Sequence, residues 1–194
     1  MTPIIAKAVW AICAVAWYII RYPHERRARK TAVSRSSRDG RELVLLSISL
    51  TGLGIVPVAY VATGFDGFAD YPFSPMRAWL GTAVFGLALY LFHRTHRDLG
   101  RNWSVSLEVR DQHRLITEGV YRMVRHPMYT AFFLWAVAQA LLLPNWIAGL
   151  SGLVGFGTLF LFRVFREERL MLETFGEEYR AYSARTKRLL PWIF

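Results

Sequence analysis

The chain has 194 residues, which suits one domain of ordinary size, and 54% of them are hydrophobic, a content that is high for a soluble domain. The formal net charge of +10 would suit a nucleic-acid-binding protein. We exclude nucleic acid as a partner, because the arginines gather at the ends of apolar runs rather than along one soluble surface.

The first apolar run, residues 4–20, predicts a membrane-spanning helix that is retained in the protein. No basic region of note precedes it and no small-residue cleavage site follows; it ends instead in the basic sequence RYPHERRARK. The only cysteine, Cys13, lies inside this run, where a lone thiol forms no intrachain disulfide. We interpret Cys13 as a small hydrophobic residue that faces the membrane.

Four further apolar runs follow, so the sequence predicts an all-α integral membrane protein with about five transmembrane helices. The five runs are residues 4–20, 43–63, 78–92, 128–143 and 146–162. Several are shorter than the ~20 residues of an ordinary span, and flanking basic and aromatic side chains extend them by snorkelling.

The loops between the runs differ in charge, and this difference sets the predicted orientation. Residues 21–42 hold eight Arg or Lys and three acids, whereas residues 64–75 hold two acids and no basic residue. Residues 93–126 and the tail from residue 163 are again rich in arginine. The positive-inside rule then places the N-terminus outside and the C-terminus inside, and we interpret residues 21–42 as a topology signal that attracts anionic lipid.

The start of the fourth run, GVYRMVRHPMY, combines cations with the beginning of a helix. Pro127 suits the first turn of a helix, whose free N–H groups attract anions, and Arg125 adds a forked cationic donor. The pattern predicts a holder for a carboxylate or a phosphate. The alternative is that Arg125 and His126 only keep the span from sliding inward.

A second charged cluster, FRVFREERLMLETFGEEY, follows the fifth run. On a helix, Arg163 and Glu167 share one face, with Glu168 about a third of a turn away. A carboxylate can bind a sugar diol, and charged residues at the mouth of a membrane cavity are functional candidates. The alternative is an interfacial face of salt bridges.

The turn at Pro144–Asn145 is so short that the fourth and fifth helices are predicted to form an antiparallel hairpin. The hairpin brings both charged clusters to one face of the membrane, and this convergence indicates a membrane enzyme. In the fifth run, the pairs Ala148/Gly152 and Ser151/Gly155 have the spacing that permits close contact between helices. His93 and His96 stand near a helix end without a third ligand at convincing spacing, so no metal site is predicted.

The two charged motifs, GVYRMVRHPMY and REERLMLETFGEEYRAYSARTKRLLPW, together resemble the isoprenylcysteine carboxyl methyltransferase family, part of a wider group of integral membrane methyltransferases. The resemblance covers residues 93–194, and the overall plan is similar to the short prokaryotic members. It implies S-adenosylmethionine as methyl donor and the carboxylate of an isoprenylcysteine-like lipophilic acceptor. It also implies a multi-pass protein of a prokaryotic inner membrane, whose partners are a lipophilic small-molecule or prenylated acceptor and membrane lipid.

The resemblance further implies roles for individual residues. The cofactor would be bound by a cytoplasmic loop, the start of the fourth helix and one acid on the ribose: His113, Leu115, Gly119, Tyr121, Arg125, His126, Pro127, Tyr129 and Glu167. Arg163 would hold the acceptor carboxylate and Glu168 would help to position cofactor or acceptor, which makes these two the predicted catalytic residues. No metal is implied.

Within a single structural domain, residues 93–194 would then form the catalytic core and residues 1–92 the side that receives the lipid substrate. The chain departs from the family in having Gly-Val-Tyr at 119–121, where many members have Gly-Pro-Tyr, and in lacking the extra N-terminal spans of the animal enzymes. Two other functions stay open. One is a phospholipid or other lipid amine N-methyltransferase that uses Glu168 or His126 as a base, and the other is a non-catalytic membrane scaffold.

Overall fold

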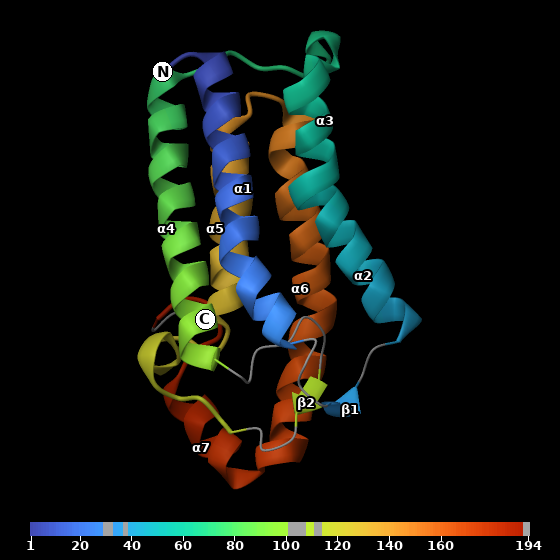
Figure 1. The fold of residues 1–194 in the computed structure, drawn as a ribbon, viewed down its shortest axis with the longest axis vertical. Coiled ribbons are helices and arrows are strands. Elements are labelled where there is room, and N and C mark those ends of the chain that lie inside the picture. Colours follow the sequence, from blue (N-terminus) through green and yellow to red (C-terminus); the bar gives the residue numbers. More distant parts are fainter. Residues whose placement is uncertain (29–32, 37–38, 101–107, 111–113, 192–194) are drawn as a thin grey trace.

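The computed structural model of the chain describes residues 1–28, 33–36, 39–100, 108–110 and 114–191. Its long helices run side by side as a bundle along one axis (Figure 1). They are α1 (Pro3–Ala28), the continuous helix of α2 (Gly40–Leu50), η1 (Thr51–Ile55) and α3 (Val56–Thr63), then α4 (Pro75–Leu99), α5 (Pro127–Leu142) and α6 (Trp146–Phe175). The shorter elements are η2 (Gly64–Gly67), η4 (Gly119–Arg122), α7 (Glu177–Arg185), β1 (Val33–Ser36) and β2 (Glu108–Arg110).

Each of the five predicted apolar runs forms a helix, which confirms the all-α membrane fold. Four of these helices are long and apolar enough to cross a membrane, namely α1, the α2–η1–α3 helix, α4 and α6. The fifth, α5, has 16 residues and is about 24 Å long, which is less than the ~30 Å of a bilayer core. Half of its residues are buried, and it packs against α4 and α6, so α5 forms the centre of the bundle.

The polar segments gather at one end of the bundle. In Figure 1, the strands, η4 and α7 lie at the lower end, whereas the N-terminus and the α5–α6 turn lie at the upper end. β1 and β2 pair as antiparallel strands, with Val33 opposite Arg110 and Ser36 opposite Glu108. This ribbon, which joins the first basic loop to the segment that precedes α5, is not predicted from the sequence.

The α5–α6 turn is as tight as the sequence predicts. Asn145 caps α6: its side-chain oxygen accepts hydrogen bonds from the backbone N–H groups of Ile147, at 3.0 Å, and Ala148, at 2.9 Å. Its amide nitrogen donates to Asp70 Oδ1 at 2.7 Å. Because Asn145 is fully buried and bonded on both sides, the hairpin is fixed, and the start of α5 lies beside the far half of α6.

Small residues let α6 approach the α2–η1 helix closely, which confirms the predicted role of the small-residue spacing. A Cβ atom on Gly155 would lie 2.7 Å from the carbonyl oxygen of Ile48, and one on Gly52 would lie 2.2 Å from that of Ser151. The buried amide of Gln139 on α5 donates to the carbonyl oxygen of Gly52 at 3.1 Å. The backbones of α5, α6 and η1 are therefore held together in the middle of the bundle.

Candidate active site

The charged residues of α6 lie in its C-terminal half, after its apolar part. With 30 residues α6 is about 45 Å long, so it exceeds a ~30 Å bilayer core by several turns. Arg163 stands 17 residues after Trp146, about 26 Å along the axis, and Glu167 and Glu168 follow one turn later. Arg163, Glu167 and Glu168 thus lie in the last half of α6, from about 26 Å along its axis outward.

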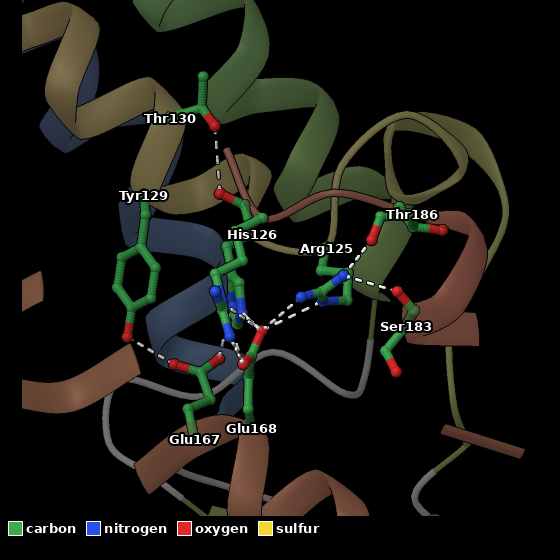
Figure 2. Close-up of polar contacts among 9 residues, drawn as sticks. Arg125, His126, Tyr129, Thr130, Glu167, Glu168, Ser183 and Thr186 are labelled. Atoms are coloured by element: carbon green, nitrogen blue, oxygen red, sulfur yellow. Dashed lines mark hydrogen bonds and ion pairs between the residues drawn. The ribbon is translucent and has the colours of Figure 1, made fainter. Parts of the chain in front are cut away.

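Glu168 is the centre of an ion-pair network (Figure 2). Arg125 Nη2 lies 2.9 Å from Glu168 Oε1, and Arg188 Nη2 lies 2.8 Å from Glu168 Oε2. His126 Nε2 lies 3.3 Å from the same Oε1 atom. The hydrogen bonds to Glu168 raise the pKa of the Arg188 guanidinium, which keeps this pair charged.

Arg125, which the sequence predicts as an anion holder, binds groups of the protein itself. Its Nε and Nη2 groups both donate to Glu168, while Nη1 donates to the carbonyl oxygens of Ser183, at 3.0 Å, and Thr186. The guanidinium therefore already binds one carboxylate and two carbonyl groups. In this structure Arg125 joins α5, α6 and the segment after α7, and its predicted contact with the cofactor stays a prediction.

The segment that follows α7 packs across the start of α5. Three donors around the beginning of α5 bond to successive carbonyl groups of this segment: Arg125 N–H to Lys187 at 2.7 Å, His126 N–H to Arg188 at 3.0 Å and Thr130 Oγ1 to Leu189 at 2.9 Å. Carbonyl groups of the C-terminal segment thus accept hydrogen bonds from the N–H groups just before α5. The sequence predicts that an anion binds at this place.

Glu167 lies beside Glu168 on α6, and Figure 2 shows both carboxylates reaching toward the ring of His126. The Tyr129 hydroxyl donates to Glu167 Oε2 at 2.5 Å, and His126 Nδ1 lies 3.8 Å from Glu167 Oε1. The rings of His126 and Tyr129 are stacked with their centroids 5.3 Å apart. The start of α5 therefore holds the two acids apart and fixes the direction of Glu167.

Arg163 is buried and pairs with a residue that the sequence analysis missed. Its Nη1 atom lies 3.2 Å from Oε1 of Glu42, which is fully buried in the first turn of α2. One turn further along α6, Arg166 pairs with the exposed Asp39 at 2.9 Å. The only sign of Glu42 in the sequence is an acid at the very edge of an apolar run, and such acids are functional candidates.

Gly119 has a conformational role. Its φ of +62° is in the left-handed region, and a Cβ atom would lie 2.1 Å from Asp98 Oδ2 near the end of α4. That oxygen accepts a hydrogen bond from the backbone N–H of Val120 at 2.9 Å. Gly119 therefore lets the loop before α5 dock on α4.

A cavity of about 690 Å³ lies inside the bundle and is apolar over most of its length. Its apolar walls include Trp17 of α1, Leu53 of η1, Phe132 of α5 and Phe156 of α6. Tyr18, Leu50 and Val58 also line it and are more than half exposed, so the cavity has an accessible edge between α1 and the α2–α3 helix.

The polar end of the same cavity is formed by the segments that gather below the bundle. Seven of the predicted site residues line it: Leu115, Tyr121, Arg125, His126, Tyr129, Arg163 and Glu167. Among the predicted residues that the structure describes, Gly119, Pro127 and Glu168 are not part of the cavity wall. His113 lies outside the described residues.

Tyr121 contributes a neutral phenol to this end of the cavity. Burial raises the pKa of Tyr121 well above its usual value, so the phenol keeps its proton at neutral pH. Its backbone carbonyl oxygen accepts a hydrogen bond from the Tyr182 hydroxyl at 2.7 Å. This contact ties α7 to η4 and closes the polar end on one side.

These features define a polytopic membrane protein with an internal cavity that joins an apolar chamber to a polar end. The family model of the isoprenylcysteine carboxyl methyltransferase family matches residues 79–173. The probable protein-S-isoprenylcysteine O-methyltransferase of Oryza sativa subsp. indica is 30% identical over 128 residues, which cover 62% of this chain and 67% of the relative. The chain belongs to the isoprenylcysteine carboxyl methyltransferase family and is an integral membrane methyltransferase.

Other relatives agree with this assignment. The protein-S-isoprenylcysteine O-methyltransferase of Homo sapiens is 35% identical over 194 residues, which cover 95% of this chain and 64% of the human protein. The solved structure of a eukaryotic intramembrane Ras methyltransferase of the same family name aligns with a TM-score of 0.55 and 23% identity, covering 81% of this chain and 54% of the other. At that identity the structural likeness supports the fold alone.

Proposed function

We propose that the chain transfers a methyl group from S-adenosylmethionine to the carboxylate of an isoprenylcysteine-like lipophilic acceptor, at the cytoplasmic face of a prokaryotic inner membrane. The observation that carries the proposal is that Arg163 and Glu167 line the same cavity, between an apolar chamber and a polar end. Its volume of about 690 Å³ falls within the roughly 300–1,000 Å³ of small-molecule sites.

The polar end fits the cofactor. Glu167 offers a carboxylate for the ribose hydroxyls, and the segment around Leu115 adds apolar surface for a flat base. His126 and Tyr121 line the same end and are proposed to contact the cofactor. When bound, the cofactor would supply an activated methyl group, which the acceptor carboxylate would take to become a neutral ester while the sulfonium would become a thioether.

The apolar chamber fits the acceptor. Its walls come largely from helices before residue 60, in agreement with a lipid-receiving role for residues 1–92, whereas the polar end is built by residues after 98. Arg163 lies where the two meet and is proposed to hold the acceptor carboxylate by its forked donors. A carboxylate is ionised at neutral pH and needs no general base, so alignment and exclusion of water are the tasks left to the protein.

Methylation of a lipid amine is less well supported by the geometry. An amine acceptor must lose a proton, and Glu168 was one of the two candidate bases. Its carboxylate is engaged by Arg125, His126 and Arg188 and does not line the cavity. His126, the other candidate base, does line the cavity. A carboxylate acceptor needs no base at all, and it is the function that we favour.

The test uses purified protein in mixed micelles with isotope-labelled S-adenosylmethionine. S-farnesyl-N-acetylcysteine should gain a base-labile label, whereas its methyl ester, which has no free carboxylate, should gain none. Label in phosphatidylethanolamine instead would support the amine methyltransferase. Absence of both label and S-adenosylhomocysteine binding would support a non-catalytic scaffold.

A further inference from the structure

Glu42 is a buried acid with an unusual environment. Its side chain is fully buried, it does not line the cavity, and its nearest cation is Arg163 Nη1 at 3.2 Å. Among the residues that the structure describes, neither carboxylate oxygen has a hydrogen-bond partner of good geometry. A buried carboxylate held mainly by charge is destabilising relative to an apolar residue, so its presence calls for a reason beyond packing.

The position of Arg163 supplies that reason. Arg163 lines the cavity, while Glu42 lies behind it on α2, so the guanidinium stands between a resident carboxylate and the cavity. Any carboxylate that enters the cavity and binds Arg163 must share the cation with Glu42 and is repelled by its charge. A neutral ester at the same place meets no such repulsion, and Glu42 remains as the counter-charge of Arg163.

We propose that Glu42 is a positioning residue that acts through Arg163 and limits how strongly Arg163 binds the acceptor carboxylate. The inference rests on the proposed function. Methyl transfer turns the anionic acceptor into a neutral ester, and a buried arginine that is less neutralised by nearby acids would bind the acid too tightly relative to the transition state. Because Glu42 partly neutralises Arg163, Arg163 binds the carboxylate of the ground state less strongly. The acceptor oxygen therefore stays more nucleophilic.

The consequence is a specific pattern in the kinetics. Glu42→Gln removes the charge and keeps the shape, so Arg163 should bind the acid more strongly, and KM for the acid should fall. Because the charge of the carboxylate diminishes in the transition state, the same change should lower kcat. A residue with a purely structural role would lower the apparent kcat through loss of folded protein and would leave KM unchanged.

The experiment compares dissociation constants of S-farnesyl-N-acetylcysteine and of its methyl ester, measured without methyl donor, for the parent and for three variants. Glu42→Gln should raise the preference for acid over ester about tenfold. Glu42→Asp, which keeps the charge but withdraws it by one methylene, should give a smaller increase in the same direction. The matched control is Asp39→Asn, three residues before Glu42. It removes an equal charge, which pairs with Arg166 instead of Arg163, and it should leave the preference for acid over ester unchanged.

An acid-over-ester preference that stays at the parental value in Glu42→Gln, or falls, would overturn the inference. If Glu42→Gln does not fold, as judged by thermal unfolding, Glu42→Asp decides: a preference at or below the parental value has the same meaning. Failure of the proposed function looks different, since the parent protein itself would then transfer no methyl group to the acid. That result would overturn both proposals.

Discussion

Arg125 and Glu168 are separated by 43 positions in the chain, yet Arg125 Nη2 lies 2.9 Å from Glu168 Oε1. The contact joins the start of α5 to the far part of α6, and Arg188 brings the C-terminal segment to the same carboxylate. The two charged clusters that the sequence analysis predicts to converge do so at the polar end of one cavity. Of the two neighbouring acids, Glu168 is held in ion pairs and Glu167 lines the cavity, so we expect different roles for them.

Glu168→Gln should destabilise the protein. Arg125 and Arg188 would lose the carboxylate that they share, and breaking a largely buried ion pair costs about 3 kcal/mol. Thermal unfolding in detergent should therefore shift to lower temperature, while the same change at the exposed Glu178 should have little effect. If unfolding is unchanged and only methyl transfer is lost, the catalytic role predicted from the sequence is the correct one.

Glu167→Gln should weaken cofactor binding with little change in stability. Its carboxylate lines the cavity, and losing hydrogen bonds between a charged group and ribose hydroxyls corresponds to about 2 kcal/mol, or roughly a 30-fold loss of affinity. Calorimetric titration of S-adenosylhomocysteine into the detergent-solubilised protein measures this effect. Glu173→Gln, on the same helix but outside the cavity wall, is the control, and equal affinities for both variants would remove Glu167 from the site.

Arg163→Met should abolish methyl transfer and also destabilise the protein, because it leaves Glu42 buried without its cation, at a cost of about 3 kcal/mol. The double variant Arg163→Met with Glu42→Gln should regain most of the stability, since the buried charge is gone, but no activity. Thermal unfolding and labelled methyl transfer measure the two effects separately. Recovered turnover in the double variant would contradict the role of Arg163 as the acceptor-binding residue.

Gly155→Ala should separate α6 from the α2–η1 helix. The new methyl group would lie 2.7 Å from the carbonyl oxygen of Ile48, a backbone atom that cannot move without its helix. Gly157→Ala on the same helix meets nothing within 4 Å and should be neutral or stabilising by up to about 1 kcal/mol, because alanine favours a helix. Equal unfolding temperatures for the two variants would show that the close contact does not form in the membrane.

Hydrophobic runs predict the fold well because each reflects a local requirement, whereas the orientation predicted from the loop charges stays a prediction. A chain in a bilayer must satisfy its backbone hydrogen bonds within each segment, so an apolar run of sufficient length becomes a helix. The limits of the helices were less predictable: the run that ends at Phe162 continues as α6 to Phe175. A helix does not stop where its apolar character stops, and here the charges beyond Phe162 find partners on α5, on α2 and in the C-terminal segment.

The order of apolar and basic segments thus determined, by itself, the membrane class, the hairpin and the meeting of two charged clusters, since spacing along a helix and the length of a turn leave few alternatives. Only the tertiary structure decided which charge meets which. It assigned Glu168 to an ion-pair network and Glu167 to the cavity, although the two are neighbours in the chain, because adjacent residues on a helix point about 100° apart. It also placed Glu42 behind Arg163, a pairing across 121 positions of sequence that no local pattern contains.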